Sequence, residues 1–222
     1  ASRFVMMNFP EGFDPLSRSC RFMLTEEAHH LFVGETGVGR TVEATCAAMN
    51  MAGITDPYDV ERIRALGVVD LPLLQRKANF HMSVTRDLFG SEISSNGAEA
   101  FSSGLKGRFN EAKLTDDHEL QNETYKVTRV IDGKLVDEDT PALRSINCRL
   151  LDDYIADCQG GIDRWNNAIR KAGIAFEFKQ PYKGFNRKIG EFAGTRISPD
   201  GKILSEAEWQ ASYPLWLPND AD

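Results

Sequence analysis

The sequence predicts a mainly α-helical protein with small β-hairpin excursions. Several segments carry apolar residues at helical spacing, and glycine- or proline-containing breaks separate them. Strand and helix patterns do not alternate as they do in a doubly wound α/β sheet. The chain also contains no internal repeat and no low-complexity tract. Together these observations favour packed helices over a parallel-sheet nucleotide-binding fold.

Residues 1–105 are predicted to form one helical part of the protein. Asp14 and Pro15 favour a helix start, because Asp caps the first turn and Pro suits its first position. This helix is expected to end at about Val33, where three glycines loosen the chain. Four more helices are predicted, over residues 40–51, 55–66, 71–88 and 98–105.

Residues 106–222 are predicted to form a mixed helical and hairpin extension that packs on the first part. Strand patterns flank Asp132 and Gly133, a pair typical of a tight hairpin turn. Thr140-Pro141 opens a long helix that is expected to end near Gly173. Four local features complete the prediction: a polar loop at 106–122, a short strand at 176–178, a turn at 199–201 and a last helix with a capping box at 205–208.

The composition argues against several classes of protein. A formal charge of −7 and a pI of about 5.2 disfavour general binding to nucleic acid or to an anionic membrane surface. No apolar run reaches the ~18 residues of a membrane span, and the N-terminus shows no signal-peptide pattern. The four cysteines form no C-x-x-C pair, which disfavours a zinc or thioredoxin-like site, and four scattered thiols in a chain of this size are typical of a reduced cytoplasm. The chain begins with Ala1 rather than Met, as a processed protein or a piece of a longer one does.

Residues 34–41, Gly-Glu-Thr-Gly-Val-Gly-Arg-Thr, differ at one position from the phosphate-binding pattern G-x-x-x-x-G-K-[ST]. Arg40 replaces the lysine, and its planar guanidinium is no equivalent of a compact ammonium group. The strand that such a loop requires would have to lie within Leu31-Phe32-Val33. A nucleotide-binding module at Gly34–Thr41 is therefore one hypothesis, which a strand ending at Val33 would support.

The preceding residues contain Glu-x-x-His twice, as Glu26 with His29 and as Glu27 with His30. Side chains three residues apart share a helix face, so each pair could bind one metal ion, as in carboxylate-bridged di-iron bundles. We predict Glu27 and His30 as the ligands, with Glu26 and His29 either as outer groups that support them or as surface groups. Periodicity alone does not exclude the other register.

One Glu-x-x-His pair is not enough for a di-iron centre, which takes two such pairs and two further carboxylates. The other two histidines, His81 and His118, have no acid three residues before them. A non-catalytic helical scaffold with an exposed, charged Glu-x-x-His is thus a third hypothesis. A continuous helix with Glu27 and His30 turned inward would favour the metal site, and the same helix with both in solvent would favour the scaffold.

Longer stretches carry a more specific resemblance: CRFMLTEEAHHLFVGETGVGR, NFHMSVTRDLFGSEISSN, GLKGRFNE, RLLDDYIADCQGGIDRWN and KGFNRKIGEF. In these the chain resembles the oxygenase components of benzoyl-CoA 2,3-epoxidases, bacterial di-iron enzymes of aerobic benzoate degradation. The likeness covers nearly all 222 residues. It implies that residues 1–105 are the C-terminal part of a ferritin-like di-iron bundle and that the likeness to a phosphate loop is accidental.

The resemblance also implies a ligand set that this chain holds only in part. Glu27 and His30 match one Glu-x-x-His pair of the family. The remaining ligands are two glutamates and a histidine on earlier helices and an aspartate on a later one, and all are expected to precede Ala1. The family also extends past Asp222. The chain is thus expected to be a fragment of a longer oxygenase.

The activity implied by the resemblance is an epoxidation. Reduced di-iron would cleave O2, one oxygen atom adding across the 2,3-bond of benzoyl-CoA and the other leaving as water. Electrons are expected from a separate NADPH-dependent reductase that carries flavin and an iron–sulfur cluster. An epoxidase of phenylacetyl-CoA would use a similar ligand set, so the metal ligands alone do not separate the two substrates, and the overall resemblance favours benzoyl-CoA.

The CoA end of such a thioester carries several negative charges. Lys183, Arg187 and Lys188 place three cations among aromatic residues and a glycine, so we predict them as contacts to phosphate or adenine. A solvated basic loop is the simpler alternative.

Overall fold

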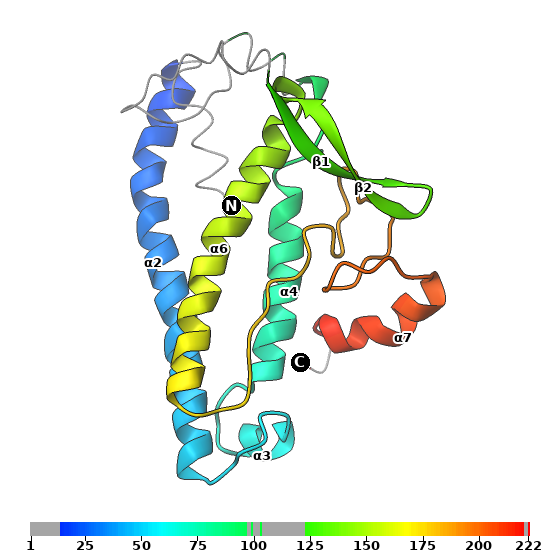
Figure 1. Ribbon diagram of the computed structural model, residues 1–222. Helices are drawn as coiled ribbons and strands as arrows, with labels where there is room; N and C mark the ends of the chain where they lie inside the picture. Colours follow the sequence, from blue (N-terminus) through cyan, green and yellow to red (C-terminus); the bar gives the residue numbers. More distant parts are fainter. Residues whose placement is uncertain (1–13, 97–98, 100–102, 104–122, 220–221) are drawn as a thin grey trace. The chain divides into compact units, whose positions relative to one another are not determined.

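The structure is a computed structural model, and it describes residues 14–96, 99, 103, 123–219 and 222. Helices dominate these residues, and the sheet found among them has two strands (Figure 1). The prediction of a mainly α fold is therefore confirmed. The predicted helix at 98–105 and the predicted loop at 106–122 lie largely or wholly outside the described residues. No helix in the described part of the chain is both long and apolar enough to cross a membrane.

The chain divides into two compact units. Unit 1 comprises Ala1–His30, Val84–Ile155 and Asn186–Thr195, and unit 2 comprises Leu31–Ser83, Ala156–Phe185 and Arg196–Asp222. Each unit draws residues from both sides of the boundary at residue 105 that was predicted from the sequence. Each unit is described separately below.

The first described helix, α2 (Asp14–Met51), is continuous over 38 residues. Two helices separated by Gly34, Gly37 and Gly39 were predicted here, and that prediction is wrong. A glycine inside a helix costs about 0.5–1 kcal/mol relative to alanine, a cost that tertiary packing can offset. At Gly39 a Cβ atom would lie 3.7 Å from the Trp165 ring, in ordinary contact, so this ring packs beside the helix at that position.

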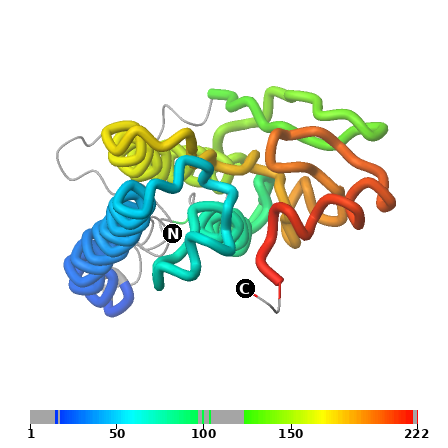
Figure 2. Tube along the Cα trace, turned by 90° about the horizontal axis from the view of Figure 1, so that it is seen from below, coloured from blue at the N-terminus to red at the C-terminus, as the bar shows by residue number. Residues whose placement is uncertain are grey.

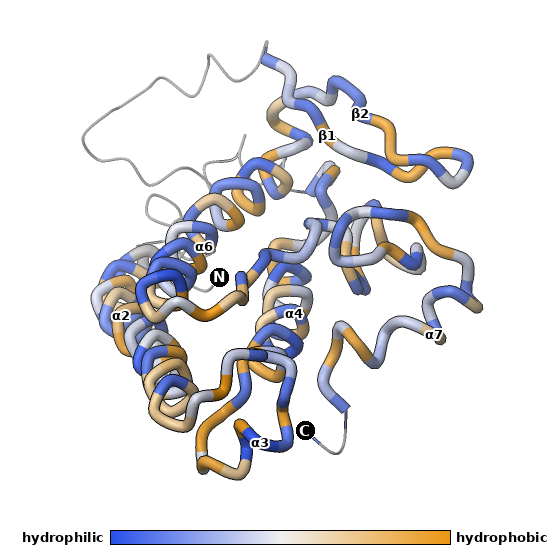
Figure 3. The backbone as a smooth tube through the Cα atoms, turned by 60° about the horizontal axis from the view of Figure 1, so that its bottom comes forward, coloured by the Kyte–Doolittle hydropathy of each residue, from blue (hydrophilic) through white to orange (hydrophobic). Residues whose placement is uncertain are grey.

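Unit 2 contains a hydrophobic core to which α2, α3 (Val60–Ala65), α4 (Leu71–Asp87) and α6 (Ile146–Lys171) all contribute. Figure 2 shows the chain after α2 turning through α3 into α4, and Figure 3 shows apolar residues along these segments. Helix α2 contributes residues spaced by four and three, as one helix face requires. The buried members of the core are Val42, Cys46, Met49, Ile54, Ile63, Leu71, Ile162, Ile169, Ile174 and Phe178.

Two helices in unit 2 end in the same way. Gly53 after α2 and Gly173 after α6 both have positive φ, +65° and +73°, which glycine adopts without steric cost. The isoleucine that follows each glycine donates its N–H five residues back, from Ile54 to Met49 O at 2.9 Å and from Ile174 to Ile169 O at 3.3 Å. Both isoleucines are buried in the core, so each helix end is also a packing contact. The helix ends predicted at residue 51 and near Gly173 are confirmed.

The last helix, α7 (Glu206–Trp216), begins with the predicted capping box. The Ser205 side chain accepts from the Glu208 N–H, and the Glu208 carboxylate accepts from the Ser205 N–H at 2.8 Å. The Ser205 N–H and the Ser205 hydroxyl both donate to the Glu208 carboxylate and hold its pKa below its usual range. The predicted turn before this helix is also present, since the Gly201 N–H donates to Ser198 O at 3.0 Å.

In unit 1 the predicted hairpin is formed by β1 (Thr124–Ile131) and β2 (Lys134–Pro141), which pair antiparallel. Asp132 and Gly133 both have positive φ, 48° and 72°, as a type I′ turn requires. A short 3-10 helix, η2 (Ala142–Arg144), leads from β2 into α6. The long helix expected from Thr140-Pro141 thus begins at Ile146 and continues through Gly160 and Gly161.

Candidate functional site

The predicted metal ligands lie on α2 within unit 1. Glu27 Oε1 and His30 Nδ1 are 3.6 Å apart on successive turns of the helix. Their exposure differs, because 24% of the Glu27 side chain and 63% of the His30 side chain are accessible to solvent. The structure therefore brings the two predicted ligands together, with Glu27 partly covered and His30 largely open.

The two residues predicted as outer groups, Glu26 and His29, are both exposed. The His29 and His30 rings are 6.3 Å apart between centroids. Among the described residues, no group of three or more His, Cys, Asp or Glu side chains could hold a metal ion. A carboxylate and an imidazole one helical turn apart can supply two ligands to a single ion, and any further ligands would have to come from outside the described residues.

Residues 34–41 are helical throughout, which overturns the hypothesis of a phosphate-binding loop. Such a loop needs a strand that runs into it and backbone N–H groups free to face the phosphates. Here the backbone N–H groups donate to carbonyl groups within α2. The Thr41 hydroxyl also donates to Gly37 O of the same helix, at 3.0 Å. The residues before Gly34 belong to the helix as well, so the required strand is absent from this segment.

The predicted cationic contacts to CoA lie in different settings. The Arg187 side chain is fully buried in unit 1, with Nε 2.7 Å from Asp87 Oδ1 and Nη1 2.9 Å from Glu92 Oε1. Lys188 is exposed, while its backbone N–H donates to Asp87 at 3.1 Å. Lys183, in unit 2, is half-buried. The charge of Arg187 is thus used inside the protein, which disfavours its predicted role and leaves Lys183 and Lys188 as the candidates.

Asp87 and Glu92 supply the two negative charges that pair with Arg187. Glu92 is 2% exposed and accepts the Glu191 N–H at 2.8 Å in addition to its ion pair. Gly190 has φ +87°, and a Cβ atom there would lie 2.0 Å from Glu92 Oε2. A buried carboxylate requires such donors, so the basic loop and its acidic partners form one structural unit.

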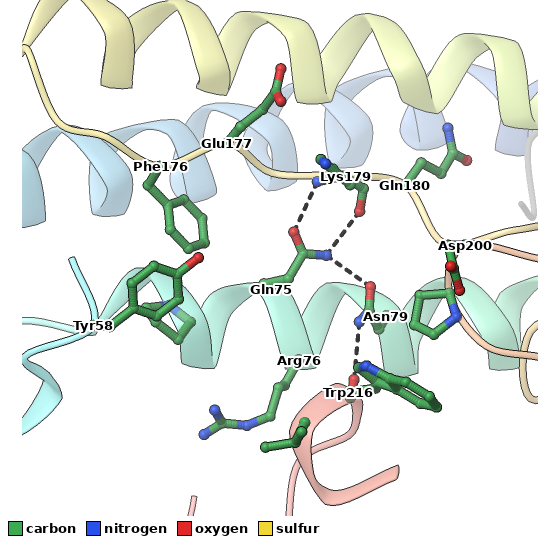
Figure 4. Close-up of a pocket in the computed structure, with 13 residues that line it drawn as sticks. Tyr58, Gln75, Arg76, Asn79, Phe176, Glu177, Lys179, Gln180, Asp200 and Trp216 are labelled. Atoms are coloured by element: carbon green, nitrogen blue, oxygen red, sulfur yellow. Dashed lines mark hydrogen bonds between the residues drawn. The ribbon is translucent and has the colours of Figure 1, made fainter. Parts of the chain in front are cut away.

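Sequence reasoning missed a set of polar contacts in unit 2, where α4 meets the chain after α6. The Gln75 side chain donates to Lys179 O at 2.8 Å and accepts the Lys179 N–H at 2.9 Å (Figure 4). Gln75 also donates to Asn79 Oδ1 at 2.8 Å, and Asn79 donates to Trp216 O at 3.0 Å. We call these four residues the amide clamp.

The residues of the amide clamp all line a groove of about 690 Å³ in unit 2 (Figure 4). The groove is lined by Tyr58, Pro72, Gln75, Arg76, Asn79, Phe176, Glu177, Lys179, Gln180, Pro199, Asp200, Leu215 and Trp216. These residues come from several separate segments of the chain. No local sequence motif marks a set of residues from distant segments, so this groove could not be predicted from the sequence.

Comparison with known proteins supports the resemblance noted from the sequence. No family model matches the chain. The chain is 54% identical over 221 residues to benzoyl-CoA oxygenase component B of Aromatoleum evansii, an alignment that covers 99% of this chain and 46% of that protein. The predicted resemblance to a benzoyl-CoA oxygenase component is therefore confirmed, and the chain spans about half the length of the relative that it matches.

Proposed function

We propose that this chain is part of a di-iron oxygenase component that oxidises benzoyl-CoA, and that it supplies one of the Glu-x-x-His ligand pairs. The observation that carries the proposal is the pairing of Glu27 and His30, 3.6 Å apart on one continuous helix. The identity to a benzoyl-CoA oxygenase component over 99% of the chain supports the substrate class.

The residues of this chain fit part of a di-iron site. The Glu27 carboxylate and the neutral His30 imidazole would hold iron, and the bound iron would supply the activation of O2. The 24% exposure of the Glu27 side chain means that it is already partly shielded from water, which strengthens its interaction with a cation. Glu26 and His29 would orient the pair or bind water at its edge.

The apolar surroundings of the pair support a site that is closed in the longer protein. Met23, one turn before Glu27 on α2, is 51% exposed, and Phe22, one turn before Glu26, is 75% exposed. Large apolar side chains gathered beside potential metal ligands fit a helix that other parts of a longer protein cover. Such a cover would exclude water from the ligands and would bring the further carboxylates that a di-iron centre needs.

The reaction that we propose is epoxidation of the ring at the 2,3-position. Benzoyl-CoA, O2, two electrons and two protons would give the 2,3-epoxide and water. The designation "component B" of the relative implies at least one further component in that system. We propose that the corresponding partner here is an NADPH-dependent flavin and iron–sulfur reductase in a bacterial cytoplasm.

A helical scaffold without catalytic function is the second candidate. The 63% exposure of the His30 side chain favours it, because a solvated Glu-x-x-His pair needs no metal. The two candidates differ in what they predict for the longer protein. The oxygenase must consume O2 in the presence of benzoyl-CoA, whereas the scaffold must not.

The experiment that tests the proposal uses the full-length protein with an electron-donating reductase and ¹⁸O2. We expect one ¹⁸O atom in the benzoyl-CoA product, and loss of that product in Glu27→Ala and His30→Ala. Wild-type protein that binds iron yet leaves benzoyl-CoA unchanged would contradict the assigned substrate. Full activity in both variants would instead remove the two residues from the site.

A further inference from the structure

The groove in unit 2 has two apolar walls. At one side the Tyr58 and Phe176 rings lie 5.9 Å apart between centroids and are tilted by 53° (Figure 4). At the other side α7 contributes Leu215 and Trp216, and Pro72 and Pro199 add further apolar surface. A volume of about 690 Å³ is in the range of sites for small molecules and is larger than one aromatic ring needs.

Hydrogen bonds join the polar residues that line the groove. In the amide clamp, Gln75 is bonded to both backbone polar groups of Lys179, and Asn79 is bonded to Trp216 O. These bonds fix α4, the chain after α6 and the end of α7 with respect to one another. A ligand therefore meets a preformed surface and does not have to order it, which favours binding.

The charges around the groove balance. Two cations, Arg76 and Lys179, and two anions, Glu177 and Asp200, give a formal sum of zero. Arg76 is also committed to Asp222, with Nη2 2.5 Å from Oδ1. A polyphosphate inside the groove would gain little from this arrangement, so the ligand that suits it is neutral.

We propose that the groove binds the pantetheine arm of an acyl-CoA thioester. This arm is the uncharged, elongated part of the molecule, with two amides, a hydroxyl group and a gem-dimethyl carbon. Its methylene and methyl groups suit the Tyr58, Phe176 and Trp216 rings, and the anionic nucleotide end lies outside the groove. The inference rests on the proposed function for the choice of an acyl-CoA, and it goes further by assigning one part of that substrate to one set of residues.

The test compares ligands that contain different parts of the substrate. The probes are benzoyl-CoA, S-benzoyl-pantetheine, which lacks the nucleotide, and adenosine 3′,5′-bisphosphate, which lacks the arm. Dissociation constants are measured by calorimetry on the full-length protein. The variants are Tyr58→Ala and Leu215→Ala, whose wild-type side chains are 66% and 74% exposed, and the control is Phe80→Ala, an exposed aromatic on α4 outside the groove.

We expect Tyr58→Ala and Leu215→Ala to weaken binding of both arm-containing probes by about 3- to 10-fold and to leave the bisphosphate unchanged. Phe80→Ala should match the wild type with all three probes. Unchanged affinities for the arm-containing probes in both groove variants would overturn the groove assignment while the proposed function stands. Loss of bisphosphate binding in the same variants would overturn it too, because the groove would then hold the nucleotide. A wild-type protein that binds no acyl-CoA would contradict both the groove assignment and the proposed function.

Discussion

Asn166 and Phe178 are joined by two hydrogen bonds in the buried part of unit 2. Asn166 Nδ2 donates to Phe178 O at 2.9 Å, and the Phe178 N–H donates to Asn166 Oδ1 at 2.7 Å. Gln75 bonds to the next residue, Lys179, in the same way. The segment predicted as a strand at 176–178 is thus no strand of a sheet. Instead, the Asn166 amide from α6 bonds the backbone of Phe178, and the Gln75 amide from α4 bonds the backbone of Lys179.

Replacing Asn166 by alanine removes both hydrogen bonds, so the backbone N–H and C=O of Phe178 lose their amide partner. Because Asn166 is 3% exposed, water cannot easily replace the amide. We expect a loss of roughly 2–4 kcal/mol in the free energy of unfolding, measured from urea or thermal denaturation. Asn167→Ala, at the exposed neighbour, is the control and should change little. Equal midpoints for Asn166→Ala and the wild type would show that the pairing does not stabilise the fold.

Gly190→Ala tests the packing of the loop on Glu92 in unit 1. The residue has positive φ, and the added methyl group would overlap the Glu92 carboxylate. We expect a loss of more than about 2 kcal/mol in the free energy of unfolding, from both strain and the displaced ion pair. Gly133→Ala is a matched control, because its φ is +72° and a Cβ atom there meets nothing within 4 Å. That variant should lose only about 1 kcal/mol. A similar loss in both variants would contradict the close approach at Gly190.

The features that were predicted correctly from the sequence depend on neighbours in the chain. The Asp132-Gly133 turn and the Ser205–Glu208 capping box are each set by residues within four positions, so their chemistry can be read locally. The helix ends at Gly53 and Gly173 belong to the same class. For the same reason Glu27 and His30 could be placed on one face of a helix before the structure was known.

The features that were missed depend on residues far along the chain. The helix continues through Gly39, where α2 packs beside Trp165 from a distant part of the chain, and the Arg187 guanidinium is held by Asp87, 100 residues earlier. A basic residue in a glycine-containing loop is easily predicted as a ligand contact, because its carboxylate partners lie far away in the sequence. The amide clamp joins Gln75 to Lys179 across 104 residues, and no periodic pattern marks such a pair.

The Arg76–Asp222 pair in unit 2 predicts a dependence of stability on pH. Hydrogen bonds from Arg76 hold the pKa of the Asp222 carboxyl below its usual range. The stabilisation is therefore fully present above the ordinary pKa of about 3.9, and it is lost as the pH falls through the lower folded-state pKa. Asp222→Asn should melt roughly 2–4 °C below the wild type at pH 7. The two melting temperatures should converge in strong acid, and a gap that persists at low pH would contradict the linkage.

Cys46 should be an unreactive thiol. It is 2% exposed, and burial, together with the nearby Glu43, raises its pKa, which lowers the fraction of reactive thiolate. Cys158 is only half-buried. We expect a thiol-specific reagent to modify Cys158 at least tenfold faster, as followed by peptide mass spectrometry, with Cys46 labelled mainly after unfolding. Faster modification of Cys46 in the native protein would place that side chain at the surface.

The register of the metal ligands is the central claim, and iron content tests it most directly. We would measure iron per chain in the longer protein for the wild type and for four variants, Glu27→Ala, His30→Ala, Glu26→Ala and His29→Ala. The account predicts about two irons in the wild type, as a di-iron centre requires, a clear loss in the Glu27 and His30 variants, and near-normal iron in the Glu26 and His29 variants. Full iron in the Glu27 and His30 variants, or a wild type without iron, would contradict it.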